Sequence, residues 1–122
     1  MKPISLSPEA VLELAEAAVW YETRQRGLAT RFLQEIDHAQ RTIQSRPLSF
    51  PKLVTTSIDL EIRRALLPRF PYALVFIELQ IEVRILAVAH LKRHPTIGST
   101  AYKIRKRRNT QTISTSSQNA WE

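Results

Sequence analysis

Basic side chains and histidines are the residues of this sequence whose types and spacing could do chemistry. Arg63 and Arg64 are adjacent, and His90 is followed closely by Lys92 and Arg93. Guanidinium groups bind phosphate oxygens in pairs, and an imidazole transfers protons near neutral pH. If the fold brings these residues together, they form a site that grips or cleaves a nucleic-acid backbone. Arginines on half-exposed strands also serve simply to solvate the outer face, so both interpretations stay open.

Several other chemistries are excluded by composition. The chain has no cysteine, which rules out disulfides, thiolate zinc sites and cysteine nucleophiles. Gly27 and Gly98 are its only glycines, too few for a P-loop or a dinucleotide fingerprint. His90 and His94 are four residues apart, but Pro95 and a predicted strand end argue against one shared helical face. We therefore expect no metal site and no cofactor.

The positive charge of the chain is concentrated near its C-terminal end. The formal net charge is +7, yet residues 1–89 hold 11 Lys/Arg against 10 Asp/Glu. Residues 90–108 contain seven basic residues and no acidic one: Lys92, Arg93, Lys103, Arg105, Lys106, Arg107 and Arg108. Such a segment attracts phosphate backbones or an acidic protein segment through long-range electrostatic forces. The alternative is a solvated basic tail that only aids solubility.

Two amphipathic helices are predicted to position these groups from one side. Ser7 and Pro8 are typical of a helix start, because serine caps free N–H groups and proline is tolerated at the first helical position. The apolar residues that follow at helical spacing are Val11, Leu14, Ala15, Ala18 and Tyr21, and Glu13, Glu16 and Glu22 lie largely off this stripe. After Gly27, a second stripe comprises Leu28, Phe32, Ile36, Ala39 and Ile43 and ends before Pro47. The short connection predicts an antiparallel helical hairpin.

Three β-strands are predicted in the second half of the chain. Residues 58–67, 69–78 and 81–89 are rich in Ile, Leu, Val, Phe and Tyr, with short breaks at Pro68 and Leu79-Gln80. The middle segment is apolar on both faces, which favours a central strand. Short connections predict an antiparallel meander, and residues 2–6 are a candidate edge strand. The fold class is therefore α+β, a helical hairpin packed on a small antiparallel β-meander.

The chain is long enough for one domain. We expect that domain to cover residues 1–95 and to be followed by a basic, polar extension over residues 96–122. Residues 109–122 are rich in Thr, Ser, Asn and Gln, so this extension is predicted to be partly disordered. No secretory signal or membrane-spanning run is found, since charged residues interrupt the most apolar stretch. The expected location is the cytoplasm.

Several runs of residues, in one collinear order over about residues 5–95, resemble a known family. The helical half contains Ser7-Pro8-Glu9-Ala10, Trp20-Tyr21-Glu22, Gly27-Leu28-Ala29 and Phe32-Leu33. The predicted sheet contains Phe50-Pro51, Arg63-Arg64-Ala65-Leu66-Leu67, Arg69-Phe70-Pro71-Tyr72-Ala73, Ile85-Leu86-Ala87-Val88-Ala89-His90 and Arg93-His94-Pro95. The combination resembles the RelE/ParE toxin superfamily, whose members have a helical hairpin packed on a small antiparallel sheet.

The resemblance implies a biological role and a partner. It implies the toxin component of a bacterial type II toxin–antitoxin module, of the kind that serves in plasmid stabilisation. The partner would be a cognate antitoxin with a partly disordered segment that wraps the toxin, which gives a hetero-oligomer. Burial of the basic surface under that antitoxin would silence the toxin by occlusion.

The resemblance leaves two mechanisms open. RelE-like members are metal-independent ribonucleases that cut messenger RNA in the ribosomal A site, whereas ParE-like members share the fold and poison DNA gyrase. Carried over by position, Arg63 or Arg64 matches the strand arginine that stabilises the phosphate. Arg93 matches the C-terminal arginine, and His90 matches the residue at the end of the last strand.

The chain departs from the family pattern directly after this segment. Family members commonly show an aromatic residue after the proline, whereas this chain has Thr96-Ile97-Gly98. This difference favours a ParE-like inhibitor that binds gyrase over a ribosome-dependent mRNA endoribonuclease. A third hypothesis is a non-catalytic nucleic-acid-binding module that uses Lys92, Arg93 and the basic run at residues 103–108.

Overall fold

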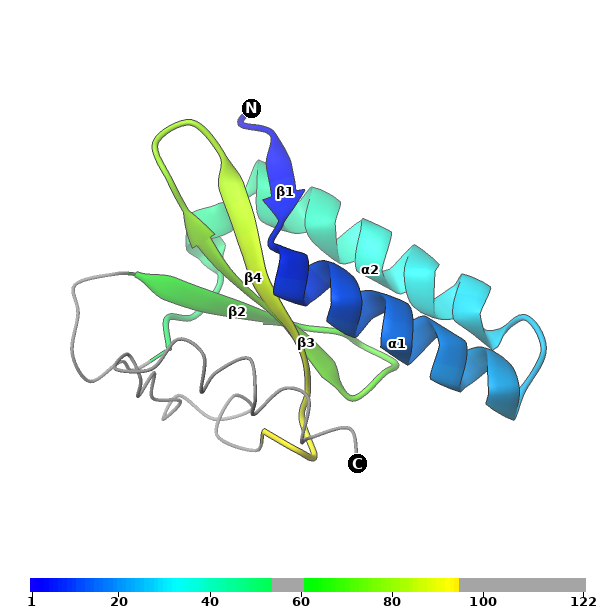
Figure 1. Cartoon of the computed structure of the whole chain (residues 1–122). Coiled ribbons are helices and arrows are strands. Elements are labelled where there is room, and N and C mark those ends of the chain that lie inside the picture. The colour runs from blue at the N-terminus through cyan, green and yellow to red at the C-terminus, as the bar shows by residue number, and fades with distance from the viewer. Residues whose placement is uncertain (54–60, 95–122) are drawn as a thin grey trace.

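Two α-helices pack on one face of a four-stranded sheet in the part of the chain that the structure describes (Figure 1). This computed structural model describes residues 1–53 and 61–94. The elements in chain order are β1 (Ile4–Leu6), α1 (Pro8–Arg24), α2 (Leu28–Ser45), a 3-10 turn (Pro47–Ser49), β2 (Ile62–Leu66), β3 (Tyr72–Glu78) and β4 (Val83–His90). The predicted α+β class, with a helical hairpin on a sheet, is confirmed.

The sheet is mixed rather than purely antiparallel. Its strand order is β1-β4-β3-β2, and β2, β3 and β4 form the predicted antiparallel meander. β1, the candidate edge strand, pairs in parallel with β4, with Leu6 opposite Ile85. β3 is central, as predicted, and its residues 72–77 are all buried. α1 then continues in the same direction along β4, where Ser7 bonds to Leu86 and Glu13 bonds to Val88.

The connection between β3 and β4 is longer than the sequence indicated. Glu78 pairs with Val83, so residues 79–82 form the loop instead of the dipeptide Leu79-Gln80. The Leu79 N–H donates to the Glu82 carbonyl at 2.8 Å. A two-residue hairpin loop would require Gly or Asn at positive φ, and the longer loop removes that requirement.

Local chemistry accounts for the start of α1 and for the break between the helices. The Ser7 hydroxyl accepts the N–H of Ala10 at 3.1 Å, as expected of an N-cap. Gly27 has φ 88°, a conformation that glycine adopts without strain. The carboxylate of Glu22 accepts the N–H groups of Gly27 and Ala29 and so satisfies the exposed start of α2. α2 buries the predicted residues Phe32, Ile36, Ala39 and Ile43.

The buried face of α1 differs from the prediction. Its buried residues are Ala10, Glu13, Ala17 and Tyr21, whereas the predicted core residues Val11 and Ala15 are exposed. Glu13, which was expected off the stripe, is only 6% exposed. Its carboxylate accepts the N–H of Val88 from β4 at 2.8 Å. A polar contact thus sets the rotation of the helix, and apolar periodicity cannot detect such a contact.

Apolar side chains fill both faces of the sheet. The larger cluster lies under the helices and includes Phe32, Tyr72, Phe76 and Ile85. The opposite face carries a second cluster, which consists of Leu53, Ile62, Ala73, Val75, Ile77 and Ala89. Within residues 1–53 and 61–94, no helix combines the length and the hydrophobicity needed to cross a membrane.

Candidate functional site

The end of β4 gathers a histidine and the basic residues that follow it. The N–H groups of Arg93 and His94 both donate to the His90 carbonyl, at 3.1 and 3.0 Å. The Leu91 N–H donates to the Pro71 carbonyl at 2.8 Å, which ties this turn to the start of β3. The chain therefore folds back on itself directly after the strand. We call the group Tyr72, His90, Lys92, Arg93 and His94 the β4 rim.

Two contacts fix the ring of His90 in the β4 rim. His90 pairs with Tyr72 across the strands, and the ring centroids are 4.9 Å apart in an edge-on arrangement. The Lys92 N–H donates to His90 Nδ1 at 3.0 Å. A neutral imidazole that accepts at Nδ1 carries its proton on Nε2. His90 therefore presents an N–H donor at Nε2.

The rim residues perturb one another's ionisation. Burial lowers the pKa of His90, and the positive charges of Arg93 and Lys92, together with His94, lower it further. Burial also lowers the pKa of His94, and Arg93 acts in the same direction. Both imidazoles are therefore neutral near pH 7. The positive charge of the rim resides on Lys92 and Arg93, which are both exposed.

The phenol of Tyr72 is also held in its neutral form. Burial raises the pKa of Tyr72 far above its ordinary value, and Tyr21 raises it further. Arg93 acts in the opposite direction, and the charge of Glu13 adds a smaller rise. Tyr72 can therefore donate or accept a hydrogen bond at the rim but does not ionise near neutral pH.

The arginine pair of β2 does not join this rim. Arg63 lies opposite Phe76 and Arg64 opposite Val75, so the two side chains point to opposite faces of the sheet. Phe76 is four residues along β3 from Tyr72, a distance of roughly 13 Å. β2 also lies one strand further across the sheet than β4. The structure thus groups the residues after β4 and leaves both β2 arginines outside.

Each of the two arginines has its own surroundings. The Arg63 guanidinium donates to the Phe50 carbonyl at 2.7 Å and lies 3.2 Å from a Glu61 carboxylate oxygen. Its side chain is 11% exposed, and its hydrogen bond ties Phe50 to β2. Arg64 lies on the face away from the helices, and its Nε is buried without a hydrogen-bond partner among the described residues. The other predicted basic residues, Lys103, Arg105, Lys106, Arg107 and Arg108, lie outside the described residues.

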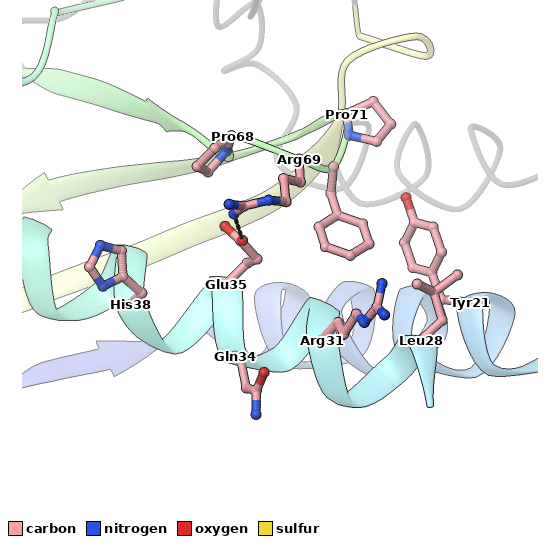
Figure 2. Close-up of a pocket in the computed structure, with 10 residues that line it drawn as sticks. Tyr21, Leu28, Arg31, Gln34, Glu35, His38, Pro68, Arg69 and Pro71 are labelled. Carbon is pink, nitrogen blue, oxygen red and sulfur yellow. Dashed lines mark hydrogen bonds and ion pairs between the residues drawn. The ribbon is translucent and has the colours of Figure 1, made fainter. Parts of the chain in front are cut away.

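A groove between α2 and the β2–β3 turn is a second candidate site, which sequence analysis missed. Its volume is about 830 Å³. Its lining residues are Tyr21, Leu28, Arg31, Gln34, Glu35, His38, Pro68, Arg69, Phe70 and Pro71. Figure 2 shows Glu35 and Arg69 facing each other between α2 and the turn, with Arg31 and Tyr21 further along. Arg69 and Glu35 form an ion pair across the groove, with 2.5 Å between Arg69 Nη1 and Glu35 Oε2.

The chemistry of this groove is apolar with an excess of positive charge. Tyr21, Leu28 and Phe70 supply apolar surface. Arg31 is exposed, and no hydrogen bond or ion pair holds its guanidinium within the described chain. In the sequence, one pattern could have indicated this groove: the helical spacing of Arg31, Glu35 and His38, which places them on one side of α2. The same pattern is equally typical of a solvated helix surface.

Metal binding has no support among the described residues. In residues 1–53 and 61–94, no three His, Cys, Asp or Glu side chains come together in a way that could hold a metal ion. The arrangement found at the β4 rim instead offers fixed positive charge and hydrogen-bond donors.

Comparisons with known proteins identify the fold. No protein-family model matches the sequence, and no curated protein matches it. The structure is similar to a chain of the chromosomal ParDE TA system from P. aeruginosa, with a TM-score of 0.62 and 18% sequence identity. The match covers 74% of this chain and 96% of that chain. The RelE/ParE-like fold implied by the sequence resemblance is therefore confirmed.

Proposed function

We propose that this chain is the toxin of a type II toxin–antitoxin module and inhibits DNA gyrase by binding it. The observation that carries this proposal is the fold shared with nearly the whole of a chain from a ParDE system. The sequence resemblance over residues 5–95 supports the same assignment independently of the structure.

The β4 rim supports binding rather than RNA cleavage. A general base must accept a proton, but the neutral form of His90 carries its proton on Nε2 and uses Nδ1 to accept the Lys92 N–H. The lowered pKa of His90 also keeps the protonated form, a general acid, scarce near pH 7. Arg63 and Arg64, which would complete a phosphate site, lie elsewhere on the sheet. Lys92 and Arg93 remain as cations that can pair with an acidic target surface.

The groove beside α2 supports the proposed antitoxin partner. A partly disordered antitoxin segment would contribute apolar anchors and acidic side chains. Tyr21, Leu28 and Phe70 offer apolar contact, and Arg31 offers a cation for an incoming carboxylate. The resulting complex would be a hetero-oligomer of toxin and antitoxin.

The test is inhibition of gyrase supercoiling by the purified chain. We expect the double variant Lys92→Ala/Arg93→Ala to need about tenfold more protein for half-inhibition, because rim charges speed and stabilise encounter with an acidic surface. The matched control, Arg26→Ala/Arg41→Ala, removes two exposed charges outside the rim and should inhibit like the original chain. Equal loss in both double variants would show that only net charge matters and would contradict a specific rim.

Two other results would redirect the assignment. Cleavage of messenger RNA at A-site codons on programmed ribosomes, without any effect on gyrase, would establish the RelE-like ribonuclease. Salt-sensitive binding to plain nucleic acid that survives Arg93→Ala and disappears when residues 96–122 are removed would establish the nucleic-acid-binding module.

A further inference from the structure

A β-bulge in β4 changes the direction of every side chain that follows it. Val75 and Phe76 are consecutive on β3, but their partners on β4 are Ala87 and Ile85, so Leu86 is an extra residue. Side chains alternate between the two faces along a strand. One extra residue therefore reverses the faces for the remainder of the strand.

The reversal is visible in the burial of β4. Before the bulge, Val83 and Ile85 lie in the core under the helices. After it, Val88 lies in that same core, although it is an odd number of residues from Ile85. His90, two residues beyond Val88, accordingly lies beside the ring of Tyr72 on the helix face. Without the bulge, His90 would point to the opposite face and the β4 rim would not form.

α1 and the residue that caps it hold the bulge in place. The Ser7 N–H donates to the Ile85 carbonyl at 2.9 Å, and the Ser7 hydroxyl donates to the Leu86 carbonyl at 3.1 Å. The Val88 N–H donates to Glu13 Oε1 at 2.8 Å. The pairing of β1 with β4 ends at Ile85, so Glu13 supplies the acceptor that a neighbouring strand would otherwise provide.

Glu13 is a buried carboxylate among small apolar side chains. Glu13 lies between Ala10 and Ala17 on the buried face of α1, and both alanines are completely buried. A buried carboxylate is costly unless charge-assisted hydrogen bonds compensate for its lost hydration. A leucine, which the helical pattern would favour here, would leave the Val88 N–H without an acceptor.

We infer that Glu13 is a positioning residue for the β4 rim, because its hydrogen bond to Val88 maintains the bulge that directs His90 toward Tyr72. Its influence on the proposed toxin activity rests on the proposed function. The geometric part of the inference stands independently of that function and is tested first.

The geometric test uses nuclear magnetic resonance on the labelled full chain. It measures the exchange rate of the Val88 amide and the proton contact between the rings of His90 and Tyr72. In Glu13→Leu, we expect amide exchange to rise at least about tenfold and the ring contact to disappear. In Glu13→Gln, the amide oxygen still accepts a hydrogen bond, so the ring contact should persist. Glu16→Leu, an exposed site on the same helix, should behave like the original chain.

Two results would overturn the inference. The first is a folded Glu13→Leu variant that retains both the slow Val88 exchange and the ring contact. If that variant does not fold, Glu13→Gln decides: a neutral amide is the weaker acceptor, so exchange at Val88 should rise several-fold while its neighbours change less. An unchanged Val88 rate in Glu13→Gln would be the second contradicting result.

The functional part is tested by gyrase inhibition. Glu13→Leu should weaken inhibition as much as His90→Ala does, and the double variant should be no weaker than either single variant. Additive losses would contradict action through His90. If the original chain does not inhibit gyrase, the proposed function fails while the resonance measurements still decide the role of Glu13.

Discussion

The histidine that ends β4 is controlled by its immediate neighbours. A backbone N–H occupies Nδ1, an aromatic ring lies against one side, and two cations stand within the same turn. These contacts keep the imidazole neutral and direct its remaining N–H. The residue that the sequence marked as a proton-transfer candidate is therefore better suited to donate a hydrogen bond.

Acid pH should destabilise the fold through the rim histidines. Burial, as the main cause, lowers the pKa of His90 and of His94 in the folded chain, while in the unfolded chain each titrates near 6.5. The unfolded chain then binds more protons as the pH falls below about 6.5, so the free energy of unfolding decreases. Urea unfolding at about pH 7.5 and about pH 5.5 should show this loss. His90→Asn/His94→Asn should lose less over the same interval, and an equal loss would contradict this account.

The burial and the hydrogen bond of Glu13 could not be inferred from the sequence. Helical periodicity placed it off the stripe because it is charged, yet it is buried and bonded to a strand. The need for it arises from an unpaired N–H on β4, which becomes apparent only when the strands are assembled. A local sequence pattern in α1 cannot show that an N–H group on β4 needs a hydrogen-bond acceptor.

At the scale of elements, the groove beside α2 yields a prediction for the antitoxin. Arg31→Glu places a negative charge where we expect a carboxylate of the partner, so co-purification with the proposed antitoxin should fall about tenfold or more. The control Arg41→Glu makes the same charge change on α2 outside the groove. Retained binding in Arg31→Glu, or equal loss in both variants, would place the antitoxin elsewhere.

Most elements could be predicted from local patterns. The serine cap, Gly27 and the apolar spacing predicted both helices, and the continuous apolar run predicted the central strand β3. The parallel pairing of β1 and the contacts of Ser7 and Glu13 at the bulge could not be predicted, because each joins residues more than 70 positions apart in the sequence. Strict alternation from Val83 and Ile85 would place Ala87 in the core under the helices, but because of the bulge Val88 lies there instead.

The groove beside α2 and the β4 rim lie next to each other in the folded molecule. Pro71 lines the groove, and its carbonyl accepts the N–H of Leu91 in the turn of the β4 rim. The buried rings of Tyr21 and Tyr72, 6.1 Å apart, lie between the groove and His90. A partner segment that fills the groove and continues past Pro71 would reach Lys92 and Arg93. The antitoxin would then silence the proposed toxin by covering the β4 rim, without a conformational change in this chain.

The most direct test of the central claim is photo-crosslinking in living cells. A photoreactive amino acid replaces Lys92 in the β4 rim, and a matched chain carries it at Arg41 on α2. We predict that position 92 captures a gyrase subunit and that position 41 does not, because the proposed function places the target against the rim. Capture of ribosomal components from position 92, with no gyrase, would contradict the account.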